Sequence, residues 1–418
     1  MCGIIAIVSF KNHIHNLSRL DEMARLIRHR GPDDEGYALF DVKSGEYRIF
    51  YGEDTPMDVV DSQLRFLPKI KYQYTSNNFT VALAHRRLSI IDLTAAGHQP
   101  MSDESGRFWI SYNGEVYNFK EIRTELINKG HRFVSNTDTE VVLKSYMMWG
   151  SECQKKFNGM WSLTIWDNLK KELWISRDRM GVKPLYYMLH DDFFIACSEV
   201  KCLIPIIDLQ PNFREIYAYL LDGPSEAHPE TFFDKINRFP AGHGALLKIN
   251  SGDRKLVLDK YWELSHPSEE MAFSDKKLKD LAEQYYHLLE DAVRLRLYAD
   301  VKVGCALSGG MDSSSISYLA DKIIREYDKD GEAITVSNIY SGEGEEYCDE
   351  SRYIDLMVNH LNVRSFRGSP EKNDVLSCND KGLWFEENCY DKFNVAAYNT
   401  YALCKKNSIK VTLDGQGA

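Results

Sequence analysis

An apolar run that stops at a pair of glycines constrains this 418-residue chain more than any other feature. The run Val301–Leu307 leads into Ser308, Gly309 and Gly310, and apolar residues then recur at helical spacing from Ile316. This pattern predicts a strand, a tight turn and a helix, because glycine lets the backbone approach a ligand closely. The free N–H groups and positive dipole end at the start of such a helix suit a phosphate.

The string Ser-Gly-Gly-Met-Asp-Ser at residues 308–313 lacks the lysine of the usual P-loop. It resembles the pyrophosphate-binding loop of ATP pyrophosphatases, enzymes that cleave ATP between its α and β phosphates to make an acyl-adenylate. We expect residues 312–315 to supply side chains that cap the helix. The alternative is an ordinary glycine turn before a buried helix. An adenylate needs a nucleophile to consume it, and the N-terminus of the chain offers a source.

Composition indicates a globular protein of more than one domain, with 44% hydrophobic residues. The formal net charge of -11 and the lack of a basic run with interleaved aromatics argue against nucleic-acid binding. No apolar run reaches the roughly 18 residues of a membrane span, so we expect no membrane partner. The nine cysteines form no CxxC pair, which argues against a disulfide framework or a zinc site and favours a cytoplasmic protein.

The chain opens with Met-Cys-Gly-Ile. Removal of Met1 would leave Cys2 with its own α-amino group beside its thiol. That amine has an ordinary pKa of about 8, so it can act as the base that activates the sulfur. The alternative is a small buried cysteine at the end of a strand.

Strand-like runs alternate with helical stripes through the first 200 residues, which predicts a layered α+β domain. The expected strands are Ile4–Ser9, Val81–Asp92, Phe108–Tyr112, Trp161–Trp166, Leu173–Ser176 and Pro184–Ser198. Residues 41–80 form a polar, aromatic-rich insertion, which we expect to be a surface hairpin without an assigned function.

Several strings resemble a class II glutamine amidotransferase domain. They are MCGI at the N-terminus, RHRGPD at 28–33, HRRLSIID at 85–92, YNGEVYN at 112–118, FNGM at 157–160, RDRMGVKPLYY at 177–187 and SEVK at 198–201. The resemblance implies an N-terminal nucleophile hydrolase fold of layered αββα type over residues 2–210. It also implies the hydrolysis of glutamine by Cys2.

The resemblance assigns roles to residues that suit this chemistry. The side chain of Asn113 and the N–H of Gly114 would stabilise the oxyanion, with Cys2 as nucleophile. Arg87 would hold the α-carboxylate of glutamine, and Glu115 and Asp138 its α-ammonium. Further substrate contacts would come from Leu88, Ser89, Ile90 and Ile91. Read singly, Arg87 could be a surface arginine, Asn113-Gly114 a hairpin turn and Asp138 a helix N-cap.

The second half resembles the asparagine synthetase family from a boundary near residues 205–211. Residues 211–418 would be a linker and the N-terminal part of an ATP-pyrophosphatase-like domain. A long helix is expected over about 275–298, with a buried stripe at Leu278, Leu281, Tyr285, Leu288, Ala292 and Leu295. Strands at 301–307, 333–339 and 410–413 predict a parallel, doubly wound sheet with ligands at the carboxyl ends of its strands.

The candidate ATP site lies at those strand ends. Its pyrophosphate would be held by Ser308, Gly309, Gly310, Asp312 and Ser313. Its adenosine would be framed by Leu307, Ser337 and Asn338. Asp414 and Gly415 resemble the start of the loop that closes over the adenylate, although a plain strand-end turn is the alternative. Asp312 is the candidate partner for Mg²⁺. The acidic residues 342–346 are expected to be a solvated loop.

The resemblance implies a glutamine-dependent ligase: glutamine supplies ammonia, ATP adenylates a carboxylate, and ammonia displaces AMP. Its partners are small molecules, and a homodimer is the candidate assembly. Aspartate is the expected acceptor, with asparagine as the product. Gln416 stands where the family leads us to expect a glutamate, so a uronic-acid sugar is the alternative acceptor. A nucleotide-binding regulatory protein is the rival from another class. Because the chain stops at Ala418, we expect an incomplete synthetase domain that retains mainly glutaminase activity.

Overall fold

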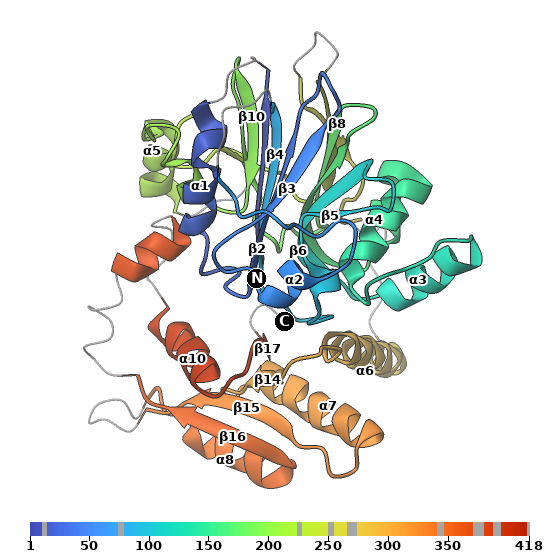
Figure 1. Cartoon of the computed structure of the whole chain (residues 1–418). Helices are drawn as coiled ribbons and strands as arrows, with labels where there is room; N and C mark the ends of the chain where they lie inside the picture. The colour runs from blue at the N-terminus through green and yellow to red at the C-terminus, as the bar shows by residue number, and fades with distance from the viewer. Residues whose placement is uncertain are drawn as a thin grey trace. The chain divides into compact units, whose positions relative to one another are not determined.

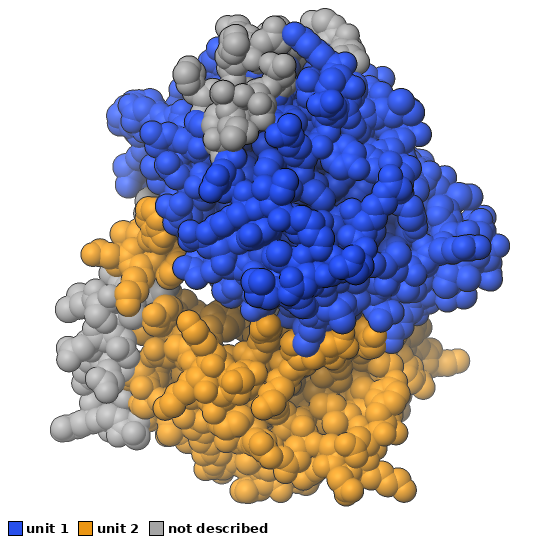
Figure 2. Space-filling model, viewed as in Figure 1, with its two compact units in different colours: residues 1–265 blue, residues 266–418 orange. Residues whose placement is uncertain are grey.

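The chain forms two compact units, residues 1–265 and residues 266–418 (Figure 2). The computed structural model describes residues 1–10, 15–73, 79–223, 228–249, 255–265, 274–340, 347–370, 380–387 and 394–415. Gln416 and the acidic residues 342–346 therefore lie outside the described residues.

Two antiparallel sheets make up the first unit. The first sheet has the order β11 (Asn237–Arg238), β9 (Tyr186–Leu189), β10 (Phe193–Cys197), β1 (Gly3–Ser9), β4 (Val81–Arg87), β2 (Asp34–Phe40) and β3 (Tyr47–Tyr51). The second has the order β13 (Val257–Lys260), β12 (His243–Lys248), β8 (Glu172–Arg177), β7 (Gly159–Asp167), β6 (Phe108–Val116) and β5 (Met101–Ser102).

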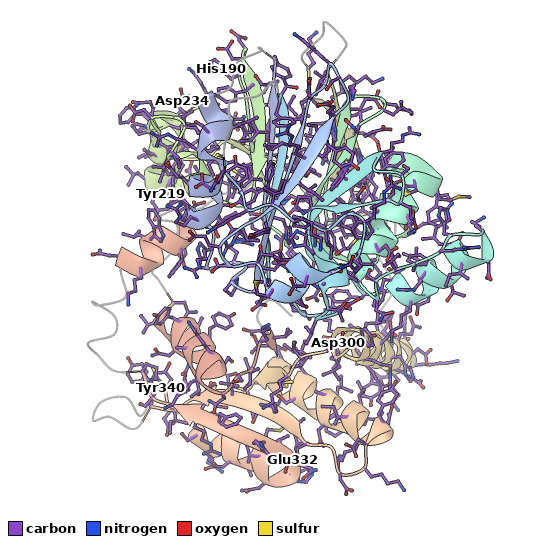
Figure 3. The ribbon with its side chains drawn as sticks, viewed as in Figure 1. His190, Tyr219, Asp234, Asp300, Glu332 and Tyr340 are labelled. Atoms are coloured by element: carbon purple, nitrogen blue, oxygen red, sulfur yellow. The ribbon has the colours of Figure 1, made fainter. Side chains whose placement is uncertain are left out.

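The two sheets face each other and helices cover their outer faces (Figure 1). Ile4, Ala6 and Val8 of β1 belong to the core between the sheets. Side chains from both sheets fill this space (Figure 3). The alternate residues Ile5 and Ile7 face the outer core. The side chains of β1 alternate between the two cores, as expected for a strand buried on both faces. The two sheets with their outer helices form the layered αββα fold that the resemblance implies.

The helices of the first unit are short. They are α1 (Leu20–Leu26), α2 (Met57–Asp61), α3 (Phe119–Asn128), α4 (Asp138–Trp149) and α5 (Phe213–Asp222), with 3₁₀ turns at His15–Arg19, Ala95–Gly97, Gly150–Lys156 and Val200–Leu203. Helix α1 packs on the outer face of the first sheet, and α3 and α4 pack on that of the second (Figure 1).

The second unit is a four-stranded parallel sheet with the order β16 (Val363–Gly368), β15 (Ala333–Asn338), β14 (Val303–Ala306) and β17 (Val411–Leu413). Its helices are α6 (Asp275–Arg296), α7 (Met311–Tyr327), α8 (Ser351–His360) and α10 (Val395–Lys406). The chain first adds strands on one side of β14 and later places β17 on the other. This reversal is the doubly wound arrangement that the sequence predicts.

Three expectations about single elements are wrong. The insertion 41–80 is more than a surface hairpin, because β3 pairs with β2 and Phe50 and Leu67 are buried. The expected strand 184–198 is two strands, β9 and β10, which pair with each other. The expected strand 81–92 ends at Arg87, and a loop follows in which Asp92 has a φ of 54°.

The prediction that α6 has a buried apolar stripe is also wrong. Leu278, Leu281, Tyr285 and Leu288 are 52%, 43%, 60% and 71% exposed, whereas Val293 near the end of the helix is buried. Helical periodicity shows that one face is apolar but not that another element covers it. The compact unit also extends past residue 210, since β12 pairs with β8 and lengthens the second sheet.

Candidate active sites

Cys2 lies directly before β1, at the end of the first sheet. Strand β4 is the antiparallel neighbour of β1, with Gly3 opposite Arg86, so the loop that follows β4 comes next to Cys2. The Cys2 thiol lies 3.8 Å from the Leu88 carbonyl oxygen, and the Leu88 N–H donates to Cys2 Sγ at 3.4 Å. The structure therefore brings the predicted nucleophile and the predicted substrate-binding loop together.

A buried network of charges holds the residue 2 backbone. Arg30 Nε donates to the Cys2 carbonyl oxygen at 2.8 Å, and Arg30 Nη1 lies 2.8 Å from Glu199 Oε1. His29 and Lys201 also contact the Glu199 carboxylate. Burial alone would raise the pKa of Glu199, but the hydrogen bond from His29 and the charges of Arg30 and Lys201 outweigh it and lower the pKa to about 2.

The N-terminal environment disfavours a charged amine. Burial lowers the pKa of the Met1 amino group to about 6, and the nearby cations Lys183 and Arg30 act in the same direction. The Met1 amine is therefore largely unprotonated at neutral pH.

Asn113 and Gly114 lie in strand β6, not in a hairpin turn. Two hydrogen bonds between the sheets hold β6 against β4. His85 Nε2 lies 3.0 Å from the Tyr112 carbonyl oxygen, and Ser111 Oγ donates to the Ala84 carbonyl oxygen at 3.1 Å. Gly114 is paired with Trp161 of β7. The buried side chain of Asn113 donates to Ser162 Oγ at 3.4 Å.

Arg87 is buried at the end of β4 and is not a surface arginine. Its Nη2 donates to the carbonyl oxygens of Asp92 at 2.5 Å and Ile91 at 3.3 Å, and its Nη1 to that of Thr94 at 3.4 Å. Arg87 therefore braces the loop that carries the half-buried residues 88–91. This support for the loop was not predicted from the sequence.

Asp138 is the first residue of α4, and the N-cap is Thr137, whose side chain accepts from the Glu140 N–H. One oxygen of the Asp138 carboxyl accepts from the Tyr112 hydroxyl at 2.8 Å and from the Val116 N–H at 3.0 Å. Burial raises the pKa of Asp138 to about 6 against these bonds, and the negative charge of Glu115 adds to the rise. Two neighbouring carboxyls at the end of β6 form a suitable place for an ammonium group.

The glycine turn of the second unit joins β14 to α7 as predicted. Gly309 has a φ of 88°, a left-handed conformation that side chains disfavour. Gly310 is the N-cap of α7, and no side chain in the described ranges caps this helix, so the expectation that residues 312–315 would do so is wrong. Backbone N–H groups at a helix start without a capping side chain favour an anion at this position.

The end of β17 comes beside this turn because β14 and β17 are parallel neighbours. A Cβ atom on Gly415 would lie 2.8 Å from the Ser313 backbone nitrogen, so glycine permits this close approach. Within the turn, Ser308 Oγ lies 3.0 Å from Ser313 Oγ. The structure thus brings Asp414 and Gly415 to the residues predicted to hold pyrophosphate.

The residues predicted to frame adenosine lie at the end of the next strand. Ser337 Oγ donates to the Leu307 carbonyl oxygen at 2.7 Å. The side-chain amide of Asn338 donates to the Ala396 carbonyl oxygen at 2.7 Å and to Thr400 Oγ1 at 2.8 Å, so it is held by α10. Asn338 Oδ1 is buried and accepts no hydrogen bond from the described part of the chain.

Among the described residues there is no group of three or more His, Cys, Asp or Glu side chains that could hold a metal ion. Asp312 is exposed near the start of α7. A single carboxylate of this kind fits an ion such as Mg²⁺, which is commonly held by one or two carboxylates together with substrate phosphates and water. No helix in the described ranges is long and apolar enough to cross a membrane.

Comparison with known protein families identifies the family of each half of the chain. A family described as glutamine amidotransferase domain matches residues 69–262, and a family described as asparagine synthase matches residues 284–418. These matches define a chain in which a glutamine amidotransferase domain is followed by a domain of the asparagine synthase family. The chain belongs to the glutamine-hydrolysing asparagine synthetase family.

Three relatives show the extent of the similarity. A protein of Methanocaldococcus jannaschii, provisionally named glutamine-hydrolysing asparagine synthetase 2, is 30% identical over 438 residues, covering 100% of this chain and 74% of its own length. Glutamine-hydrolysing asparagine synthetase 3 of Bacillus subtilis is 29% identical over 84% of this chain and 50% of its own. Amidase chry2 of Gibberella zeae is 29% identical over 79% of this chain and 44% of its own. The chain thus spans half or less of the length of two of the three.

Proposed function

We propose that this chain carries a glutaminase site at Cys2 and an ATP site at residues 308–313 of a ligase that amidates a carboxylate. The observation that carries the first part is the convergence of Cys2, Leu88 and Arg87 at the end of two neighbouring strands. The convergence of β14, α7 and β17 supports the second.

In the glutaminase site, the Cys2 thiolate attacks the side-chain carbonyl carbon of glutamine, with the Cys2 amine as base once Met1 is removed. Asn113 and Gly114 donate to the oxyanion, and ammonia leaves. Water then hydrolyses the thioester to give glutamate. Glu115 and Asp138 bind the α-ammonium group, and Arg87 binds the α-carboxylate and supports the loop.

In the synthetase site, a substrate carboxylate attacks the α-phosphate of ATP and pyrophosphate leaves. The uncapped N–H groups of α7, together with Ser308, Gly309, Gly310 and Ser313, bind the leaving pyrophosphate. Leu307, Ser337 and Asn338 border the adenosine, and Asp414 and Gly415 lie over the adenylate. When bound, Mg²⁺ would neutralise phosphate charge beside Asp312. Ammonia then displaces AMP, and the acceptor becomes an amide.

We propose aspartate as the acceptor and asparagine as the product, in the cytoplasm, where thiols stay reduced and ATP is available. The relatives named as asparagine synthetases support this acceptor. Gln416 favours the second candidate, a uronic-acid sugar, because an amide at this position cannot accept a proton as a carboxylate does.

The test uses glutamine labelled with ¹⁵N in its side-chain amide. The protein is incubated with ATP, Mg²⁺ and either aspartate or a uronic-acid sugar, and products are identified by mass spectrometry. Labelled asparagine with matching amounts of AMP and pyrophosphate is the expected result. Detection of a labelled sugar amide would show that the acceptor is the uronic-acid sugar and not aspartate. Absence of labelled ammonia as well as of any amide would contradict the glutaminase assignment itself.

A further inference from the structure

A pocket of about 430 Å³ lies on the outer face of the second sheet of the first unit. Strands β8, β12 and β13 contribute to its lining, together with the 3₁₀ turn Gly150–Lys156. Its described lining contains none of the residues assigned to the glutaminase site or to the ATP site. A volume of this size is within the range of pockets that bind small molecules.

Glycine at position 244 leaves space at the floor of this pocket. Gly244 is paired with Ser176 of β8, two positions along from the pair of Leu246 with Trp174. A Cβ atom on Gly244 would lie 2.9 Å from Gln154 Oε1, 3.2 Å from Gln154 Nε2 and 3.4 Å from Trp174 Nε1. A side-chain amide and an indole nitrogen therefore converge beside the glycine.

Gln154 is fully buried, and hydrogen bonds set the orientation of its amide. Trp161 Nε1 donates to Ser176 Oγ at 3.0 Å, and Ser176 Oγ donates to Gln154 Oε1 at 2.8 Å. An indole N–H can only donate, so the serine keeps its own proton for the amide oxygen. The amide nitrogen, Nε2, has no hydrogen-bond partner in the described part of the chain. Because a buried donor without an acceptor is costly, an acceptor from outside the chain fits this position.

The second donor beside Gly244 is held in place as well. The indole ring of Trp174 is buried and stacks on Tyr146 of α4, with the ring centroids 4.7 Å apart. Its Nε1 can only donate, and Gln154 Oε1 already accepts from Ser176. The floor of the pocket thus offers two N–H donors to a ligand, which suits an oxygen acceptor and not an ammonium group.

The rest of the lining indicates what accompanies that acceptor. Leu246 contributes apolar surface. The charged residues of the described lining, all exposed, are Lys248, Lys255 and Asp259. The Lys248 ammonium lies 3.5 Å from Glu172, which offsets part of its charge, yet the lining itself carries two cations and one anion. A negatively charged ligand with an apolar portion matches this combination.

We propose that the pocket binds a small organic carboxylate with an apolar body. One carboxylate oxygen accepts from Gln154 Nε2 and Trp174 Nε1 in the space that Gly244 leaves, and the apolar body lies against Leu246. The inference goes beyond the proposed function, because this site takes no part in glutamine hydrolysis or in adenylation. Binding makes and breaks no covalent bond.

Phenylacetate is the test probe, because it combines one carboxylate with an apolar ring. Its binding to Cys2→Ala protein is measured by saturation-transfer NMR, with glutamine and ATP in excess so that the candidate catalytic sites are occupied. We expect binding to persist under these conditions. Phenylacetamide, which has nearly the same shape without the charge, should bind about tenfold more weakly, since hydrogen bonds to a charged acceptor are stronger.

Two variants change the floor of the pocket. Gly244→Ala places a methyl group in the space that the carboxylate oxygen would take, and Gln154→Glu replaces the amide donor with a carboxylate. Each should weaken phenylacetate binding by at least about tenfold. Gln210→Glu makes the same change at an exposed residue and should leave binding unchanged. Folding is verified by circular dichroism, and either floor variant suffices if the other fails to fold.

Four results would contradict the proposal. Loss of the phenylacetate signal when glutamine and ATP are added would assign the binding to a catalytic site. Equal binding to the parent and to a folded floor variant would exclude the floor donors as the binding groups. Equal affinity for phenylacetamide would overturn the assignment of a carboxylate. If no phenylacetate binds to the parent protein, the space beside Gly244 holds only water.

Discussion

The two units of this chain bury their apolar residues to different degrees. In the first, three cores occupy the space between the sheets and beneath the outer helices. In the second, two small clusters join α6 and α7 to β14, and α10 to β15, while the apolar side chains in the first half of α6 stay exposed. The candidate sites differ accordingly: the candidate glutaminase site is built mainly from side chains held by hydrogen bonds and supported by the Arg30–Glu199 ion pair, and the candidate ATP site from backbone groups and small residues.

The largest expected effect comes from the nucleophile. Cys2→Ala should lower glutamine hydrolysis by more than about 10⁴-fold, since no other described residue replaces the thiolate. The fold should persist, because alanine removes one sulfur atom at a half-buried position. Ammonia release is measured by a coupled glutamate dehydrogenase assay. Cys348→Ala, which changes an exposed cysteine of the second unit, is the control. Activity of Cys2→Ala at the parent rate would refute the mechanism.

The next prediction compares apolar side chains in the two units. Phe194→Ala, in the core between the sheets, should lower the free energy of unfolding of the first unit by about 3–5 kcal/mol. Leu288→Ala, on the exposed face of α6, should change that of the second unit by less than about 0.5 kcal/mol. Hydrogen exchange in urea, resolved by peptide, gives each unit its own value. A cost for Leu288→Ala similar to that for Phe194→Ala would show that the α6 face is covered in solution.

Arg87→Ala tests a residue with two roles. Loss of an ionic contact to the glutamine carboxylate should raise KM by about 10- to 100-fold. Because Arg87 also braces the loop through three carbonyl oxygens, we expect kcat to fall as well. Steady-state kinetics separates the two constants, and Arg87→Lys should recover part of the loss. An effect on kcat alone would limit Arg87 to supporting the loop.

The smallest effect concerns pH. The pKa of Asp138 is raised to about 6 by burial, so its carboxyl is mostly neutral at pH 5 and mostly ionised at pH 7. An ammonium group is attracted only by the ionised form, so glutamine should bind about tenfold more weakly at pH 5 than at pH 7. Calorimetric titration of Cys2→Ala protein isolates binding from catalysis. The profile should become flat in the Cys2→Ala, Asp138→Asn double variant; a remaining slope would assign the titration to another group.

Local patterns predicted more of the fold than of the packing between distant elements. The apolar run Ile4–Ser9 is a property of neighbouring residues, and it correctly indicated a strand. The stripe from Leu278 to Leu288 has the spacing of a buried helix face, yet burial depends on a second surface that no local pattern specifies. For the same reason the sequence did not indicate that residues 41–80 contribute to the core.

In the candidate sites, too, local motifs were visible in the sequence, whereas contacts between distant residues were not. Cys2, Asn113, Gly114 and the 308–313 turn could be proposed as site residues from the sequence because their motifs are contiguous in the chain. Arg30 and Glu199 were missed as a pair, since they are 169 positions apart and only the sheet brings them together.

The position of Cys2 one residue before β1 limits how the protein can be produced. Any residue left in front of Cys2 converts the proposed base into an amide, which cannot accept the thiol proton. A purification tag or a fusion partner attached at this end would yield a folded but silent glutaminase until a protease exposed the cysteine. The same sensitivity could be used deliberately: a cleavable leader would make ammonia release start on demand.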